Sequence, residues 1–466
     1  MMTWILTIIR DISDCQNLHT SIIFRGMKIF FDKAVWMIVP TLLVILLFAS
    51  CSKKNEPVKA TSMAEAFLKA QSATPTVDTT KKTALERLTF NQSLALTDSG
   101  SKVFNERKAI EIVRDLETGW NLGNTFDATG GGGSLKSETS WGQPKTTQAM
   151  IEGLAASGIK TLRIPVSWSH HISDTHYTID TAWMARVKEV ADWAIDAGMY
   201  VIINIHHDNY DKDAKMPAMA GFYPTDENYE NSADFVCNIW GQISLAFNNG
   251  YDEHLIFEAL NEPRLGGTNE EWWYNAASSK SRMAMENLNK LNQNILDVIR
   301  ASGGNNQKRL VAFPSLQASP DSALATTFKM PRDYDGSKDR LIVSVHMYTP
   351  YNFAMESPGI TEYSEAVKKE FTSMFKRLND NFIQKGYAVY IGEYGATNKN
   401  NLQDRINWFH DFIKESRVYG MPCFLWDNGV WEVKENNYSE HYGYYNRYNQ
   451  TWYFPEILDA IIEEAK

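Results

Sequence analysis

Eight short apolar segments, separated by longer segments of helical periodicity, constrain the fold of this chain more than any other feature. Several of them are nearly continuous apolar runs, which are typical of strands buried on both faces of a sheet. Such strands need helices on both sides, so they indicate an α/β architecture. The predicted strands are 119–124, 159–166, 200–206, 254–262, 309–315, 341–348, 387–395 and 422–429.

The stretches between these strands have the spacing of helices that bury one face. Segment 181–197 shows it best, with Trp183, Val187 and Val190 along one side. Eight strands that alternate with helices predict a single (β/α)8 TIM barrel, and a doubly wound open sheet is the alternative. The other predicted helices are 146–157, 232–248, 281–301, 361–385 and 402–418.

Polar residues gather at the C-terminal ends of seven of the eight predicted strands. A barrel brings all these ends to one mouth, so residues far apart in sequence converge there, whereas an open sheet implies no such convergence. The fifth strand, which ends in Pro314-Ser315, contributes least. The residues concerned are Asn121, Asn124, Arg163, His206, His207, Asn261, Glu262, His346, Tyr348, Glu393, Trp426 and Asp427.

Two carboxylates stand out in this set, Glu262 in LNEPR and Glu393 in IGEYG. They end the fourth and seventh strands, which face each other across a barrel. Hydrolysis of a glycosidic bond needs two carboxyl groups on either side of the bond, and a gap of about 5–5.5 Å makes one a nucleophile and the other an acid/base. The pair therefore predicts a glycoside hydrolase.

The two carboxylates then need opposite protonation states. We expect Glu393 to be ionised, with Arg163 as the cation that lowers its pKa and Tyr348 as a hydrogen-bond donor. We expect Glu262 to hold a proton, while the amide of its neighbour Asn261 binds a sugar 2-hydroxyl.

His206, His207 and His346 are expected to orient the sugar or the carboxylates. A purely structural role for His206-His207 is the alternative. A metal site at His206-His207-Asp208 is disfavoured, because adjacent strand residues point to opposite faces and no HExxH helix is present. We expect no metal and no cofactor.

Aromatic residues make up 12% of the chain, and several tryptophans follow predicted strands. Trp426 ends the eighth strand, where an indole can stack on the apolar face of a pyranose; core packing is the alternative. Five more tryptophans lie in predicted loops on the same side. Each alone is more typical of packing than of sugar stacking, but five exposed indoles would be hard to explain by packing. They are Trp141, Trp168, Trp272, Trp273 and Trp431.

The charge balance argues against nucleic acid as a partner. The chain has 46 Lys and Arg against 56 Asp and Glu, a net charge of −10, and phosphate binding needs a surplus of basic groups. Of the four cysteines, Cys237 and Cys423 lie within apolar stretches, where we expect buried free thiols rather than a disulfide.

The first hundred residues have the composition of an export signal and a tether. Residues 34–50 are uncharged, and Phe48-Ala49-Ser50-Cys51 resembles a bacterial lipobox, in which Cys51 is acylated. Translation from Met27 gives a signal of ordinary length, so 1–50 is interpreted as an upstream extension and a lipoprotein signal peptide. We expect 51–101 to be a tether and 102–466 the catalytic barrel. The protein is then exported, either anchored in the outer membrane by its lipid or secreted.

From about residue 104 onward, the motifs GWNLGNTFDA, TLRIPVSW, INIHHD, FEALNEP, VHMYTP, IGEYG and FLWDNG occur in the order found in one family. The chain resembles glycoside hydrolase family 5, whose members are retaining (β/α)8 enzymes. The resemblance implies that Glu262 is the acid/base and Glu393 the nucleophile. It implies a surrounding site of Arg163, His206, Asn261, His346, Tyr348 and Trp426, with Asn124 and His207 binding the sugar nearest the cleaved bond.

Within that family, GWNLGNTFDA, ETSWGQPKTT and WDNG are most similar to the endoglucanases that act on β-1,4-glucans. Phe126 and Gln143 depart modestly from that pattern. The resemblance implies a monomeric endo-β-1,4-glucanase acting on a neutral polysaccharide. The alternatives are an endo-xyloglucanase, a mixed-linkage glucanase or an endo-β-mannanase with the same carboxylates, and, more distantly, a non-catalytic glycan-binding lipoprotein.

Overall fold

The computed structural model describes residues 82–92, 97–210, 221–434 and 440–465, all within one unit, Ser62–Lys466. The predicted signal peptide, the lipidation site at Cys51 and the first part of the predicted tether lie outside the described residues.

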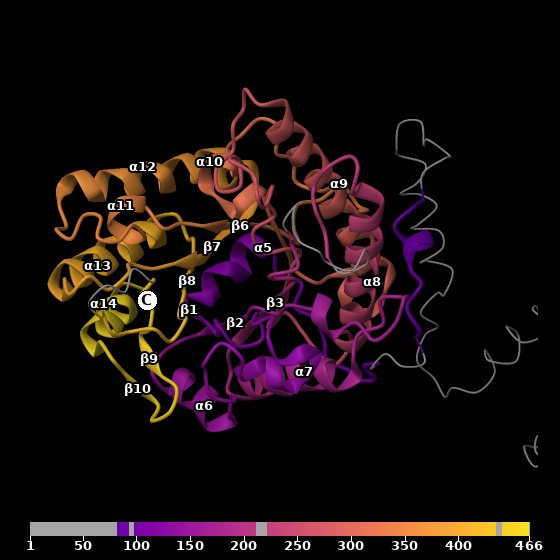
Figure 1. The fold of residues 1–466 in the computed structure, drawn as a ribbon, viewed down its shortest axis with the longest axis horizontal. Helices are drawn as coiled ribbons and strands as arrows, with labels where there is room; N and C mark the ends of the chain where they lie inside the picture. The colour runs from indigo at the N-terminus through magenta and orange to yellow at the C-terminus, as the bar shows by residue number, and fades with distance from the viewer. Residues whose placement is uncertain (1–81, 93–96, 211–220, 435–439, 466) are drawn as a thin grey trace, which may run out of the picture. The chain divides into compact units, whose positions relative to one another are not determined.

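Eight parallel strands close into a barrel in sequence order, and β1 pairs with β8 to complete it (Figure 1). The prediction of a (β/α)8 barrel is confirmed, and the open sheet is wrong. The strands are β1 Thr118–Asn121, β2 Thr161–Ile164, β3 Tyr200–Asn204, β4 Leu255–Glu258, β5 Val311–Pro314, β6 Leu341–His346, β7 Ala388–Tyr394 and β8 Cys423–Leu425.

Long helices surround the strands (Figure 1). Most begin where a side chain accepts a backbone N–H of the first turn, as Thr147 does from Met150 and Asp180 from Trp183. They are α6 Gln148–Ala156, α7 Thr181–Asp196, α8 Tyr229–Ala246, α9 Ser279–Ala301, α12 Glu365–Asn381, α13 Leu402–Val418 and α14 Pro455–Ala465.

Shorter elements complete the described chain. A two-stranded antiparallel ribbon joins β9 Tyr445–Asn446 to β10 Thr451–Trp452. The short α-helices are α5 Ala109–Ile112, α10 Pro320–Ala323 and α11 Tyr351–Ala354. The 3-10 turns are η1 Leu85–Arg87, η2 Val113–Leu116, η3 Gly131–Gly133, η4 Leu135–Thr139, η5 Ser169–His171, η6 Gly304–Gln307, η7 Leu316–Ala318 and η8 Ile383–Lys385.

The segment α5–η2 closes the N-terminal end of the barrel. Its apolar residues Ile112, Val113 and Leu116 pack with side chains from the strands, among them Ile256 and Tyr390. This end is therefore filled by apolar packing, which leaves the C-terminal ends of the strands for polar chemistry.

The described end of the predicted tether packs on the barrel unit. Arg87, almost fully buried, forms ion pairs with Glu230 and Asp234 on α8, at 2.8 and 2.7 Å. The carboxylate of Asp98 accepts the backbone N–H groups of Asn248 and Gly250. Residues 82–92 and 97–101 of the predicted tether thus make polar contacts with the rest of the unit, and the boundary at residue 102 stays a prediction.

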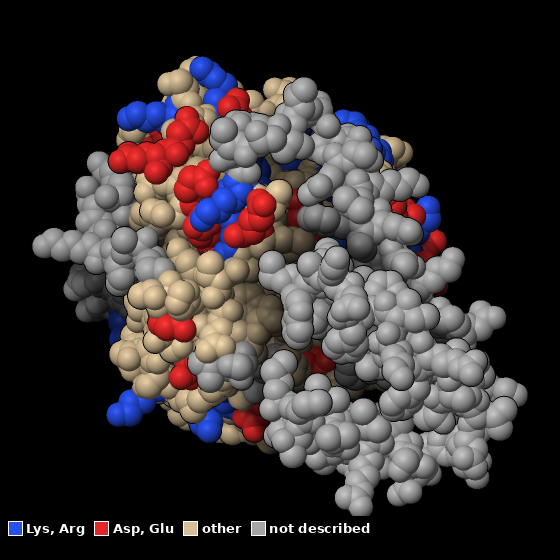
Figure 2. Space-filling model, turned by 90° about the vertical axis from the view of Figure 1, so that its right-hand side faces the viewer, with Lys and Arg blue, Asp and Glu red and all other residues tan. Residues whose placement is uncertain are grey.

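Cys237 and Cys423 are buried free thiols, as predicted. On the face of the molecule shown in Figure 2, acidic and basic side chains of the described residues are interspersed, with the basic ones not gathered into one patch.

Candidate active site

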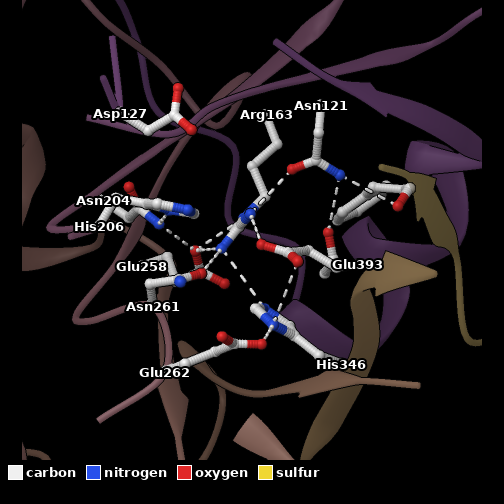
Figure 3. Close-up of polar contacts among 12 residues, drawn as sticks. Asn121, Asp127, Arg163, Asn204, His206, Glu258, Asn261, Glu262, His346 and Glu393 are labelled. Carbon is white, nitrogen blue, oxygen red and sulfur yellow. Dashed lines mark hydrogen bonds and ion pairs between the residues drawn. The ribbon is translucent and has the colours of Figure 1, made fainter. Parts of the chain in front are cut away.

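Arg163 lies at the centre of the C-terminal mouth, with its side chain fully buried (Figure 3). Its Nη1 donates to Glu393 and to Asn121, both at 2.8 Å. Its Nη2 donates to Oδ1 of Asn261 at 2.8 Å. One guanidinium thus connects strands β1, β2 and β7 with the loop after β4.

Glu393 is held in place by two donors. Besides Arg163, the hydroxyl of Tyr348 donates to Oε2 of Glu393 at 3.0 Å. The register between β6 and β7 shifts after Val345, and this irregularity pairs His346 with Glu393. A bulge of this kind re-aims side chains at a strand end, here into the mouth.

Glu262 lies across the site from Glu393. Its Oε1 is 2.8 Å from Nδ1 of His346, which is also 3.6 Å from Oε2 of Glu393. Potential ligand atoms of Glu262, His346 and Glu393 all lie within 4.8 Å of one another, so the two carboxylates approach each other closely. The Glu262 side chain is 18% exposed and that of Glu393 7%, which leaves Glu262 the more open of the two.

The surroundings shift the pKa values of this pair in directions opposite to those expected. Burial raises the pKa of Glu393, helped by the charge of Glu262, and outweighs Arg163 and His346. Burial also opposes ionisation of Glu262, but the hydrogen bond and charge of His346 outweigh it and lower the pKa of Glu262. The pKa of His346 is itself raised against burial by the charges of Glu393 and Glu262.

A buried network of hydrogen bonds, which was not predicted from the sequence, lies directly beneath these residues. Glu258 of β4 is fully buried, and Nη2 and Nε of Arg163 contact its Oε2 at 2.6 and 2.8 Å. Asn204 of β3 donates to the same oxygen at 2.9 Å. The sequence signal was a single acidic residue inside the apolar run LIFEAL, because a buried charge requires a partner.

Asn204 also fixes the tautomer of His206. Its Oδ1 accepts the backbone N–H of Val166 and its amide donates to Glu258, so the amide orientation is determined. The contact of 3.1 Å from this amide nitrogen to Nδ1 of His206 then makes Nδ1 an acceptor. Burial lowers the pKa of His206 well below its usual value, so the ring is neutral and its proton lies on Nε2.

Trp426 and His206 stack at the mouth, with ring centroids 5.9 Å apart and planes 3° from parallel. His207 lies edge-on to His206 and 5.5 Å from the ring of Trp141. Asn124 adopts a positive φ of 54°, where the carboxylate of Asp127 accepts its backbone N–H at 3.0 Å. The structure thus brings all of the predicted barrel residues of the site to one end of the barrel.

The carboxylate of Asp208, which the sequence analysis disfavoured as a partner of His206 and His207 in a metal site, is engaged elsewhere. The carboxylate of Asp208 instead accepts the backbone N–H groups of Trp168 and Ser169. Asp127 is the acid whose ligand atom comes within 4.8 Å of both histidines. Its oxygens already accept two backbone N–H groups and His206 presents N–H rather than a lone pair, so this donor set does not suit a metal ion.

Of the loop tryptophans, four are exposed and one is not. Trp168 is fully buried and donates to the backbone oxygen of Asn204, so it packs in the core, as expected of each tryptophan alone, and is no candidate for sugar stacking. Trp141, Trp272, Trp273 and Trp431 are 39%, 59%, 53% and 40% exposed.

The loop after β4 links one of these tryptophans, Trp272, to Glu262. Arg264 donates to the backbone oxygen of Glu262 at 3.1 Å, and its guanidinium lies 4.5 Å from the ring of Trp272. Glu271 accepts from Arg264 and from the backbone of Gly267, which closes the loop on itself.

Comparison with known proteins identifies the family. Residues 124–431 match the family model "Cellulase (glycosyl hydrolase family 5)". The chain belongs to glycoside hydrolase family 5. It is therefore a hydrolase of glycosidic bonds and a member of a retaining family, as predicted.

Individual relatives agree with this assignment. Endoglucanase B of Ruminococcus albus is 39% identical over 360 residues, covering 77% of this chain and 81% of the relative. The structure of a family 5 lichenase from Caldicellulosiruptor sp. F32 is 39% identical, with a TM-score of 0.72, over 79% of this chain and 98% of the lichenase. A GH5-4 broad specificity endoglucanase from Ruminococcus champanellensis, solved with cellotriose, is 35% identical with a TM-score of 0.70, over 78% and 100%.

Proposed function

We propose that this protein is an endo-β-1,4-glucanase that cleaves cellulose-type glucans by double displacement, with Glu393 as nucleophile and Glu262 as acid/base. The observation that carries these roles is the close approach of Glu262 and Glu393, within 4.8 Å through their nearest ligand atoms. Retaining glycosidases hold their carboxyl groups about 5–5.5 Å apart, whereas inverting ones leave room for a water between them. The relatives named endoglucanase support the endo activity.

In the first step, the Glu393 carboxylate attacks the anomeric carbon while the bond to the leaving oxygen breaks. Glu262 transfers a proton to that oxygen, so the leaving chain departs as an alcohol. In the second step, Glu262 removes a proton from a water that attacks the same carbon, and Glu393 departs as a carboxylate.

Glu262 must carry a proton when the leaving oxygen departs. Nδ1 of His346 lies 2.8 Å from Oε1 of Glu262, and Nη2 of Arg163, which only donates, lies 3.4 Å from Nε2 of the same ring. Binding of a sugar excludes water from Glu262, which disfavours its charge and raises its pKa.

Three groups recognise the sugar nearest the cleaved bond. The Asn261 oxygen accepts from Arg163, so its amide hydrogens are directed at the 2-hydroxyl. His206 presents its Nε2–H as a donor, and Trp426 offers its ring for stacking. Asn124 and His207 lie at the edge of the same pocket and complete the polar contacts.

A mixed-linkage β-glucan is the second candidate substrate. It is favoured by the similarity to the lichenase, a solved structure 39% identical to this chain. The exposed Trp141, Trp272, Trp273 and Trp431 support either polymer, because indole rings stack on unbranched glucan regardless of how its linkages alternate.

A panel of polysaccharides with sizing of the products tests this function. Carboxymethylcellulose and mixed-linkage β-glucan should give a ladder of oligosaccharides with early loss of viscosity, while xylan should stay intact. The control is Glu393→Gln, which should release nothing from either glucan. Release of glucose alone from chain ends, or hydrolysis of mannan or xyloglucan without action on these glucans, would contradict the assignment.

We further propose that the protein is exported and anchored by a lipid on Cys51. The support is the uncharged run 34–50 followed by the lipobox-like sequence. Within the described residues, no helix is long and apolar enough to span a bilayer. A radiolabelled fatty acid should mark the protein and its Cys237→Ala control but not Cys51→Ala, and labelling of Cys51→Ala would refute the anchor.

A further inference from the structure

Glu258 is a third carboxylate in the site, and it is enclosed by protein on all its hydrogen-bonding sides. Oε1 accepts from the hydroxyls of Ser344 at 2.6 Å and Tyr390 at 2.9 Å. Oε2 accepts from Arg163 and Asn204. With its side chain fully buried and both oxygens occupied, Glu258 touches no substrate.

Glu258 is ionised in this setting. Burial alone would favour the neutral acid, but the charges of Arg163 and His346 outweigh it and lower the pKa of Glu258. The four donors around the two oxygens also require a carboxylate that only accepts.

One guanidinium therefore serves two carboxylates. Arg163 contacts Glu258 at 2.6 Å and Glu393 at 2.8 Å (Figure 3). Without Glu258, the whole positive charge of Arg163 would act on Glu393 in a buried site, where charges interact strongly. A carboxylate stabilised in this way is a weaker nucleophile.

We propose that Glu258 is a positioning residue that divides the charge of Arg163 and so keeps Glu393 basic enough to attack the sugar. It also holds the amide of Asn204, and through it the Nε2–H tautomer of His206. The proposal rests on the assignment of Glu393 as nucleophile.

The alternative is that Glu258 serves stability alone, as a buried partner for Arg163. The two roles differ in what they do to the pH profile. If Glu258 is purely structural, its replacement should lower stability or activity without moving the pH profile of kcat/KM. If Glu258 divides the charge of Arg163, its replacement by a neutral residue should move that profile.

The test is Glu258→Gln, assayed on an aryl cellobioside across pH. Removal of a negative charge stabilises the Glu393 carboxylate and destabilises the proton shared by His346 and Glu262. Both limbs of the kcat/KM profile should therefore move to lower pH, by about one unit. The maximum should fall by about tenfold or more, and an unmoved profile in a folded Glu258→Gln would overturn the proposal.

Two further variants keep the test sound. Glu258→Asp retains the charge and should leave both limbs within about 0.3 unit of the wild type, even if turnover drops. Tyr390→Phe removes one hydrogen bond and no charge, so it should not move the limbs downward. If Glu258→Gln does not fold, a downward shift in Glu258→Asp would still contradict the proposal.

A separate experiment tests whether Glu393 is the nucleophile. Its result distinguishes a failure of that assignment from a failure of the inference about Glu258. Azide should restore cleavage of the aryl cellobioside by Glu393→Ala and give the glycosyl azide of inverted configuration. If azide restores nothing, the nucleophile is misassigned. If azide rescues Glu393→Ala and Glu258→Gln keeps the wild-type profile, only the inference about Glu258 fails.

Discussion

At the scale of single residues, each of two groups in the site contacts two carboxylates. Arg163 is shared by Glu258 and Glu393, and His346 by Glu262 and Glu393. Each carboxylate thus has a neighbour that sets its protonation. Glu262 is bonded to His346 and is more exposed than Glu393, as an acid that must reach a leaving oxygen should be.

Replacement of Glu262 by alanine should separate substrates by their leaving groups. A 2,4-dinitrophenyl leaving group needs no proton, so formation of the glycosyl-enzyme should survive, with kcat/KM within about tenfold of the wild type. Cleavage of polymer needs the proton and should fall by about 10²–10⁴-fold. Equal losses on both substrates would contradict the role of Glu262 as acid.

The residues that touch sugar or carry protons were predictable because they follow apolar strands. Glu258 and Asn204 were not, since both lie inside the predicted strands 254–262 and 200–206. In the structure they end β4 and β3, at positions paired in register. A polar residue there looks like an interruption of the strand until its partners from β2 and β6 are known. The lowered pKa of Glu262 likewise depends on the 2.8 Å contact with His346, which sequence does not reveal.

At the scale of elements, periodicity identified the barrel strands and the long helices except α14, Pro455–Ala465, which was not among the predicted helices. The segment α5–η2 and the ribbon β9–β10 were not predicted, because they are too short to show a hydrophobic period. Gly250, which precedes β4, does not adopt a positive φ. A Cβ on Gly100 would come within 2.2 Å of the Gly250 Cα, so close approach of two backbones explains a glycine in this region.

We expect the loop after β4 to contribute to binding of the polymer without taking part in catalysis. Trp272→Ala should raise KM for carboxymethylcellulose by about tenfold, the effect of losing about 1.4 kcal/mol of binding. It should change kcat/KM for a short aryl cellobioside little, because the leaving side of that substrate lacks sugars to stack. Tyr334→Ala is the control, since Tyr334 is 51% exposed but precedes β6, at the other end of the barrel. Equal effects on both substrates would show that the loop acts on catalysis instead.

At the scale of the whole molecule, the buried His171 and His206 and the partly buried His207 make the fold sensitive to mild acid. Burial lowers the pKa of His171 and of His207 to about 4, and that of His206 well below its usual value. In the unfolded chain each histidine titrates near 6.5. The unfolded state therefore takes up protons first as the pH falls below about 6.5, and stability decreases until the folded-state pKa is reached.

His171 allows this acid sensitivity to be tested away from the active site. Its ring stacks on Trp183 with centroids 3.7 Å apart and planes 4° from parallel, an arrangement that phenylalanine can keep. A shift from 6.5 to about 4 corresponds to roughly 3 kcal/mol of stability lost at low pH. His171→Phe should therefore unfold at a higher temperature than the wild type at pH 4.5, with a much smaller difference at pH 7.5. The exposed neighbour His170 supplies the control variant His170→Phe. If the difference in unfolding temperature between His171→Phe and the wild type does not grow from pH 7.5 to pH 4.5, the buried neutral imidazole is not the cause of the acid sensitivity.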